Sequence, residues 1–392
     1  MGRVAALLLL AIATADCRTE PLRPDKPTPT SPADLAAPVD DLAARVDALS
    51  EPRDLATTVD LAVEATADLA ARLDLSPVAD LACAADVQND AANCGFCGHD
   101  CLGGACTGGV CQPFAISPTA YPEHLALSGG FAYWIDYVTR AVMRSDLSGA
   151  ATDVLVNNPT GYGIDSLVAD DTSLFWTIEL PHPTDSCVMS ANVDGSGVTT
   201  MLSGLPNLPT LAIDTDAVFV DDAVDIRRIP RDGSPTSLVT AVSGSGERLW
   251  VDASSVYFDD CAYTGCSGFA VPKDGSAAPS RLSNYFVAVS DSSVFFLDPG
   301  PGNMETLLSQ PKSGTTATTL ATVPEPVGNI AADSADIFHL YFLESILYRL
   351  PVGGGNWNTM AVVATGGGSS DLAIDAKRVA FIAGSRVWVV AR

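Results

Sequence analysis

The sequence predicts an all-β fold, a β-propeller of seven blades, preceded by a disordered spacer and a small disulfide-rich module. The first observation behind this prediction is a hairpin pattern that returns seven times: a short apolar strand, a polar turn, and a second strand rich in aromatic and β-branched residues. The second is the period, because successive copies begin 38 to 44 residues apart, at Leu125, Leu167, Leu211, Leu249, Val287, Ile330 and Leu372. Strands that recur at about 40 residues are typical of a propeller. We favour seven blades over six, the alternative that the irregular sixth copy leaves open.

The third observation is that a period holds four strands, which is one propeller blade. A third apolar run follows the hairpin and closes on a glycine turn, as at Gly149, Gly195, Gly233 and Gly275. A fourth run comes next, for example residues 237–240. The last period supplies only three strands, so we expect residues 114–117 to pair with its open edge and close the ring. The predicted propeller therefore spans 112–392.

Residues 1–16 have the character of an export signal, in which Arg3 is followed by an apolar run over 4–13 and then by small residues. The run is too short to span a membrane as a helix. Cys17 is the candidate for lipidation, as in a bacterial lipoprotein, and the alternative is a mature chain that starts at Asp16. Both interpretations predict an extracytoplasmic protein, either secreted or held at the outer membrane or cell surface. Contact with a membrane is expected only through an N-terminal lipid.

The stretch 17–82 is predicted to be a disordered spacer. It has no aromatic residue after Cys17, and the tripeptide Asp-Leu-Ala recurs in it, beginning at Asp34, Asp41, Asp54, Asp60, Asp68 and Asp80. Without large apolar side chains such a segment cannot bury enough surface to offset the entropy lost on ordering. We interpret it as a tether.

Six cysteines fall within residues 83–111, namely Cys83, Cys94, Cys97, Cys101, Cys106 and Cys111. In an exported protein this density predicts three disulfides, whose connectivity the sequence leaves open. The alternative is a metal-binding knuckle formed by Cys94, Cys97, His99 and Cys101. The core from Asn93 to Gly98 resembles the Stig1-like cysteine-rich modules, and that resemblance implies extracellular binding or spacing without chemistry. We expect a rigid, disulfide-linked collar between the spacer and the propeller.

Cysteines also occur inside the predicted propeller. Cys261 and Cys266 bracket four residues in the loop between two strands of the fourth copy, so we predict a small disulfide ring there. Cys187 is then left over if Cys17 is lipidated, and we predict that it is a buried thiol at the start of a strand.

The second strands of three copies carry a family resemblance. They read Tyr133 to Asp136, Phe175 to Ile178 and Tyr257 to Asp260, and each is followed by a turn of the Asp-Gly type. They resemble degenerate copies of the YWTD motif of low-density-lipoprotein-receptor propellers, over about residues 119–392. The resemblance implies an extracellular interaction propeller with no catalytic residue, although those receptors have six blades. From the residues themselves we expect these aromatic side chains to pack between blades.

The sequence offers no catalytic arrangement that we can assign. The four histidines are far apart in the repeat register, and no serine–histidine–aspartate order or phosphate-loop glycine pattern is present. Acidic residues recur at matching places, and four of them, Asp136, Asp222, Asp260 and Asp298, are weak candidates for binding Ca²⁺ at a channel mouth. The competing interpretation is that these acids cap strands and keep loops soluble. No other cofactor is expected.

The net charge of −26 argues against nucleic acid or an anionic membrane surface as a partner. The leading functional hypothesis is a non-enzymatic surface or periplasmic module that binds a protein or a glycan. The alternatives are a Ca²⁺- or Zn²⁺-dependent propeller hydrolase or lactonase, and a purely structural envelope component. Acids that converge at the channel would favour the hydrolase, whereas a channel lined by apolar and hydroxyl groups would favour the other two. An aromatic cluster at one mouth, including Trp250 or Trp357, would favour binding.

Overall fold

The computed structural model describes residues 85–117, 121–158, 163–179, 186–206, 209–244, 248–262, 265–283, 285–299, 304–324, 329–341, 343–363 and 369–392. The predicted signal (1–16), the predicted spacer (17–82), Cys17 and Cys83 lie outside these residues. Within them the regular structure is entirely β, and no helix is long and apolar enough to cross a membrane.

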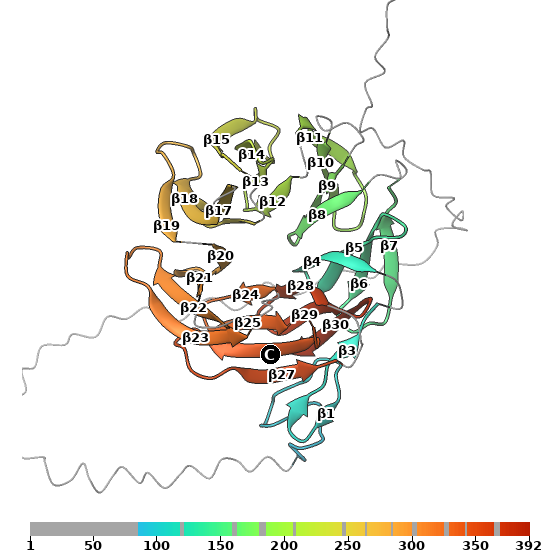
Figure 1. Cartoon of the computed structure of the whole chain (residues 1–392). Helices are drawn as coiled ribbons and strands as arrows, with labels where there is room; N and C mark the ends of the chain where they lie inside the picture. Colours follow the sequence, from blue (N-terminus) through green and yellow to red (C-terminus); the bar gives the residue numbers. More distant parts are fainter. Residues whose placement is uncertain are drawn as a thin grey trace, which may run out of the picture. The chain divides into compact units, whose positions relative to one another are not determined.

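Seven four-stranded antiparallel sheets form the blades of a propeller, as predicted (Figure 1). Within blades 1 to 6 the strands follow one another in chain order from the inner to the outer edge, so every blade is a meander. The strands of blades 1 to 3 are β4 (Pro122–Ser128), β5 (Phe131–Asp136), β6 (Ala141–Asp146), β7 (Thr152–Val156), β8 (Ile164–Ala169), β9 (Ser173–Ile178), β10 (Ser186–Asn192), β11 (Thr199–Leu205), β12 (Thr210–Ile213), β13 (Ala217–Asp221), β14 (Asp225–Pro230) and β15 (Ser237–Ala241). The strands of blades 4 to 6 are β16 (Leu249–Val251), β17 (Ser255–Ala262), β18 (Gly265–Pro272), β19 (Ser280–Ser283), β20 (Phe286–Val289), β21 (Ser293–Pro299), β22 (Met304–Pro311), β23 (Thr318–Pro324), β24 (Ile330–Ala332), β25 (Asp336–Tyr341), β26 (Ile346–Pro351) and β27 (Asn358–Val362). The sixth copy, irregular in sequence, therefore forms a complete blade.

Blade 7 closes the ring with a strand from the other end of the propeller. It consists of β28 (Ser369–Ile374), β29 (Arg378–Ala383), β30 (Arg386–Ala391) and β3 (Phe114–Ala115). Beyond β3, the Ile116 amide donates to the Val387 carbonyl (2.9 Å) and the Val387 amide donates to Ser117 Oγ (2.9 Å). The three-plus-one closure predicted for residues 114–117 is thus confirmed.

The core lies between the blades, because the side chains of each second strand are buried against both neighbouring sheets. Trp176 of blade 2 shares an apolar cluster with Tyr133 of blade 1, whereas its neighbour Phe175 packs with Val218 of blade 3. Alternate residues of a strand point to opposite faces, so one blade contributes to two clusters. The aromatic side chains of the YWTD-like motifs are therefore packing residues, as expected.

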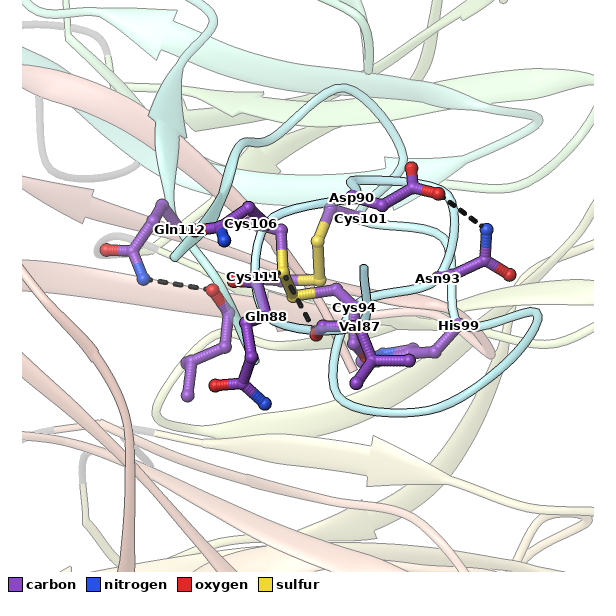
Figure 2. The surroundings of a disulfide bond; sticks show 12 residues. Val87, Gln88, Asp90, Asn93, Cys94, His99, Cys101, Cys106, Cys111 and Gln112 are labelled. Carbon is purple, nitrogen blue, oxygen red and sulfur yellow. Dashed lines mark hydrogen bonds between the residues drawn. A yellow bond between two sulfur atoms is a disulfide. The ribbon is translucent and has the colours of Figure 1, made fainter. Parts of the chain in front are cut away.

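The cysteine-rich module contains β1 (Cys106–Thr107), β2 (Val110–Cys111) and two adjacent disulfides, Cys94–Cys106 and Cys101–Cys111 (Figure 2). The sulfur atoms of Cys94, Cys101 and Cys111 lie within 4.8 Å of one another, but all three are in disulfides and are not thiolate ligands for a metal. Cys97 is also disulfide-bonded. The module packs on blades 6 and 7 through a shared apolar cluster, and His99 lies between the carbonyl oxygens of Cys94 and Arg392.

The propeller contains further disulfide-bonded cysteines. Cys261 and Cys266 face each other across β17 and β18 and form a disulfide near the end of that long hairpin. Cys187, which we predicted to be a thiol, is disulfide-bonded, so that prediction was wrong. The error came from counting partners along the sequence, where the spatial neighbour of a cysteine is not visible.

Candidate functional site

The innermost strands of the blades surround a central channel, and a cavity of about 460 Å³ opens along it beside blades 2 to 6. Apolar side chains form most of its wall, including Leu211, Ile213, Val251 and Val289. Polar residues gather at one end, where each inner strand turns into the second strand. These are Asp252, Ser290, Asp291 and Asp333 of the turns, together with Lys312, which follows the third strand of blade 5 and pairs with Asp252. The cavity can therefore accept an apolar group under a charged rim.

Trp250 is the large aromatic residue of this wall. Its ring is partly buried and meets Phe286 of blade 5 edge-on, with centroids 6.3 Å apart. Trp357 lies elsewhere, between blades 5 and 6, where its Nε1 donates to the Thr322 carbonyl (3.1 Å). Of the two tryptophans suggested by the sequence, Trp250 is the one that the cavity exposes to a ligand.

The turns that follow the inner strands carry a repeated acid, and we call this set the turn ring. In five blades Oδ1 of the acid accepts backbone amides two and three residues ahead, which fixes the turn. The five acids are Asp170, Asp214, Asp252, Asp333 and Asp375. In four of these blades the other carboxylate oxygen forms an ion pair with a cation from the next blade. The pairs are Asp170–Arg231, Asp214–Lys273 (2.6 Å), Asp252–Lys312 (2.7 Å) and Asp333–Arg392 (2.5 Å).

The exceptions to the turn ring indicate that the two positions depend on each other. Ser290 replaces the acid of blade 5, and Val352 replaces the matching cation of blade 6. Ser128 and Val193 make the same double replacement between blades 1 and 2, where the Ser128 hydroxyl donates to Asp171 instead (2.7 Å). Between blades 7 and 1, Leu147 occupies the position of the cation. Among the described residues, Asp375 therefore has no cation from the next blade. This pattern is that of a structural brace between blades.

Aromatic rings of the second strands support the cations of the turn ring. Lys312 Nζ lies 4.6 Å from the centroid of Tyr257, whose hydroxyl donates to the same Asp252 carboxylate (2.8 Å). Arg231 and Arg392 lie in the same way over Phe175 and Phe338. Burial raises the pKa of Asp252, but the bond from Lys312 and the turn amides outweigh it and hold that pKa well below its usual range. Each of the four acids therefore bonds the amides of its own turn and also pairs with a cation of the next blade.

The other end of the channel carries a second ring, formed by the residue just before the repeated apolar position of each inner strand. We call it the polar ring. Its members are His124, Ser166, Thr210, Arg248, Phe286, Asn329 and Asp371. Four of them bond to the inner edge of the following blade. Asp371 Oδ2 accepts the Leu125 amide (2.6 Å), Ser166 Oγ accepts the Leu211 amide (3.3 Å), Arg248 Nη1 donates to the Val287 carbonyl (3.4 Å), and Asn329 Nδ2 donates to the Ser370 carbonyl (2.5 Å).

The charges of His124 and Arg248 act on Asp371, the carboxylate of the polar ring. Burial raises the pKa of Asp371, while the backbone bonds and the charges of His124 and Arg248 oppose that rise. His124 Nε2 is 4.0 Å from Asp165 Oδ1, and these side chains are 35% and 41% exposed. His124 also has a left-handed backbone (φ 54°) beside a register shift in β4. The members of the polar ring all precede the repeated apolar residue, so the sequence repeat could have identified their position. It did not, because their residue types differ from blade to blade and form no motif.

Among the described residues, no three of the four aspartates proposed as metal ligands lie close enough to hold one ion. Asp136 accepts the Val138 and Thr139 amides (both 2.9 Å), and Asp222 accepts the Val224 and Asp225 amides and pairs with Arg227. Asp260 Oδ2 accepts the Ser243 amide and hydroxyl (3.1 and 2.8 Å), and Asp298 lies opposite Thr306 on β21. Among the described residues, only Cys94, Cys101 and Cys111 of the cysteine-rich module form a set of three potential ligands close enough to hold one ion. Asp136 and Asp222 thus fix the turns that follow them, whereas Asp260 bonds the connection between blades 3 and 4.

One neighbour of these acids has altered ionisation. Asp221 is 2% exposed, and its Oδ2 has no hydrogen-bond partner among the described atoms. Burial, with the nearby charges of Asp222 and Asp260, raises the pKa of Asp221 to about 7. His339 is buried among Tyr341, Tyr348 and Trp357, and burial lowers its pKa to about 4. Neither residue lines the cavity.

No protein-family profile matches the chain, and no curated protein matches it in sequence. Virginiamycin B lyase from Staphylococcus aureus is similar in structure, with 12% identity, a TM-score of 0.56, and coverage of 72% of this chain and 98% of the lyase. A chain of the mitotic checkpoint complex aligns with 9% identity and a TM-score of 0.53 over 72% of this chain and 91% of its own. A chain of a nidogen–laminin complex aligns with 14% identity over 57% of this chain and 90% of its own, at a TM-score of 0.43, which is too low to establish a shared fold. The comparisons therefore show that this chain is a β-propeller, and they show the fold alone.

Proposed function

We propose that the protein is exported, held at a membrane through a lipid on Cys17, and that its propeller is a non-enzymatic module that binds a protein partner. The observation that carries the proposal is the channel cavity, with its apolar wall, its partly buried Trp250 and its charged rim. Concave apolar sites with a few polar groups at the edge are typical binding sites.

The wall of the cavity favours a protein segment over a glycan. Sugars need hydrogen-bonding groups along most of their surface, whereas Leu211, Ile213, Val251 and Val289 offer none from their side chains. An apolar side chain inserted beside Trp250 would gain roughly 25 cal/mol for each Å² removed from water. Asp291 at the rim is exposed and forms no ion pair among the described residues, so it is available to a basic group next to that side chain. A net charge of −26 would steer such a basic segment to the propeller.

The hydrolase and lactonase alternative has less support. It requires carboxylates that converge around a metal, and no three of the candidate aspartates within the described residues do so. The lyase likeness does not supply a site, because a relation at 12% identity concerns the fold. The structural-component alternative would leave Trp250 and the cavity without a role.

A displayed random peptide library tests the proposal directly. We expect selection on the full chain to enrich peptides that place a Lys or Arg next to an aromatic or aliphatic residue. The variant Asp291→Lys should lose that enrichment, whereas Glu344→Lys, at an exposed position away from the cavity, should keep it. Enrichment that is equal on all three proteins, or none on the wild type, would overturn the proposal.

A further inference from the structure

The turn ring and the polar ring differ in how far their residue types vary from blade to blade. The turn ring repeats one chemistry, acid with cation, in four of its junctions. The polar ring places a different residue at the same point of each blade, including one cation, one carboxylate, one imidazole, two hydroxyls and one amide. A repeated brace needs no such variety. A ligand without seven-fold symmetry does, because each of its groups must meet a different partner.

Two charged groups of the polar ring have donors or lone pairs that their bonds to the backbone do not use. Arg248 uses Nη1 for the Phe286 and Val287 carbonyls (3.5 and 3.4 Å), which leaves the donors of Nε and Nη2, and Arg248 forms no ion pair within the described segments. Asp371 accepts the amides of Leu125 and Leu372 (2.6 and 2.7 Å), which leaves lone pairs on both of its oxygens. A partly buried cation gains most from a carboxylate that approaches it in a bidentate way.

The signs of the charges define the class of ligand. Arg248 belongs to blade 4, whereas Asp371 belongs to blade 7 and His124 to blade 1, so the cation and the carboxylate come from separated parts of the ring. Asp165, next to His124, adds a second carboxylate on the side of Asp371 and is 41% exposed. A purely anionic ligand would meet Asp165 and Asp371, and a purely cationic one would meet Arg248. A ligand with both charges satisfies both sides.

We propose that the polar ring binds a small zwitterion of the α-amino acid class, with its carboxylate on Arg248 and its ammonium on Asp371 and Asp165. This site is separate from the charged rim of the cavity, which lies at the other end of the inner strands. It does not depend on the binding of a protein there.

The test is a calorimetric titration of the full chain with the standard L-amino acids, supported by saturation-transfer NMR for weak binders. Acetate, methylammonium and glucose serve as probes that carry only the carboxylate, only the ammonium, or neither charge. We expect at least one amino acid to bind at least about ten-fold more tightly than any of the three, a difference of about 1.4 kcal/mol. Binding of glucose or acetate as tight as that of the best amino acid, or no binding by any amino acid, would overturn the proposal.

Two variants locate the site. Arg248→Gln keeps donors for the blade 5 carbonyls but removes the charge, and it should weaken the best amino acid at least ten-fold. Asp371→Asn keeps an acceptor for the Leu125 amide, and it should bring the affinity down toward that of acetate. Glu344→Gln, at an exposed loop, is the matched control and should bind as the wild type does. Unchanged affinity in both ring variants, with thermal melts that show them folded, would contradict the assignment.

Discussion

At the scale of single residues, the position of a carboxyl group decides its chemistry in this propeller. Asp252 and Asp221 both lie near strand ends, yet the pKa of Asp252 is held down by Lys312, whereas that of Asp221 is raised to about 7 by burial beside other acids. The sequence predicted acids in register but could not separate these cases, because burial and the sign of the neighbouring charge come from other blades. The ion pair of Asp170 with Arg231 is likewise not visible in the sequence, because the two residues belong to different blades.

The raised pKa of Asp221 makes stability depend on pH. Because the folded chain holds this proton more tightly than the unfolded chain, the stabilisation is complete below about pH 4 and is lost as the pH rises through about 7. The loss is up to about 1.4 kcal/mol per pH unit in that window. Asp221→Asn should therefore match the wild type near pH 4 and exceed its free energy of unfolding by about 4 kcal/mol near pH 8.

Urea unfolding between pH 4 and 8 measures this difference. Asp216→Asn, at an exposed turn position, is the control and should follow the wild-type pH dependence. Parallel curves for Asp221→Asn and the wild type would show that the Asp221 carboxyl ionises normally.

At the scale of elements, blades are joined by the turn ring as well as by apolar packing. The sequence predicted the strands and the closing strand well, because the alternation of apolar residues and the glycine turns are local signals. It did not show the ion pairs, because each joins residues from successive blades, for example 61, 59 and 60 positions apart. Once the period is known, an acid with a cation about 60 residues later becomes a searchable signal.

The paired replacements at Ser290 and Val352 predict coupling between Asp252 and Lys312. Lys312→Val should lower the free energy of unfolding by about 2 kcal/mol, because it leaves a partly buried carboxylate without its cation. Asp252→Ser together with Lys312→Val, which reproduces the natural pair of the next junction, should lose less than the sum of the single changes. A double-mutant cycle by chemical unfolding should give a coupling of about 1 kcal/mol or more. Strict additivity would show that the pair does not act as a brace.

At the scale of the whole molecule, the propeller depends on closure by a segment from its N-terminal side. Ile116 is 3% exposed and packs with residues of blades 1 and 7. Ile116→Asp should therefore lower the free energy of unfolding by about 3 kcal/mol or more, since it buries a charge at the junction. Val110→Asp, at a site 49% exposed in the cysteine-rich module, should change it by less than about 0.5 kcal/mol. Similar melting temperatures for the two variants would mean that closure of the ring contributes little to the stability of the propeller.

Export and anchoring also belong to this scale, and they remain predictions from residues 1–17. Replacement of Cys17 by Ser should move the protein from the membrane fraction to the soluble fraction of a bacterial host and abolish metabolic labelling with palmitate. Retention of the variant in the membrane fraction would contradict lipidation at Cys17.

The most direct test of the proposed protein-binding site is to measure stability and ligand affinity on the same set of variants. For a peptide obtained by selection on the wild type, calorimetry should show an affinity at least ten-fold weaker for Asp291→Lys, with the free energy of unfolding unchanged. Lys273→Val, which removes the cation paired with Asp214 outside the cavity lining, should show the reverse, a loss of stability with the affinity of the folded protein kept. If Asp291→Lys binds the peptide as the wild type does, the cavity is not the protein-binding site.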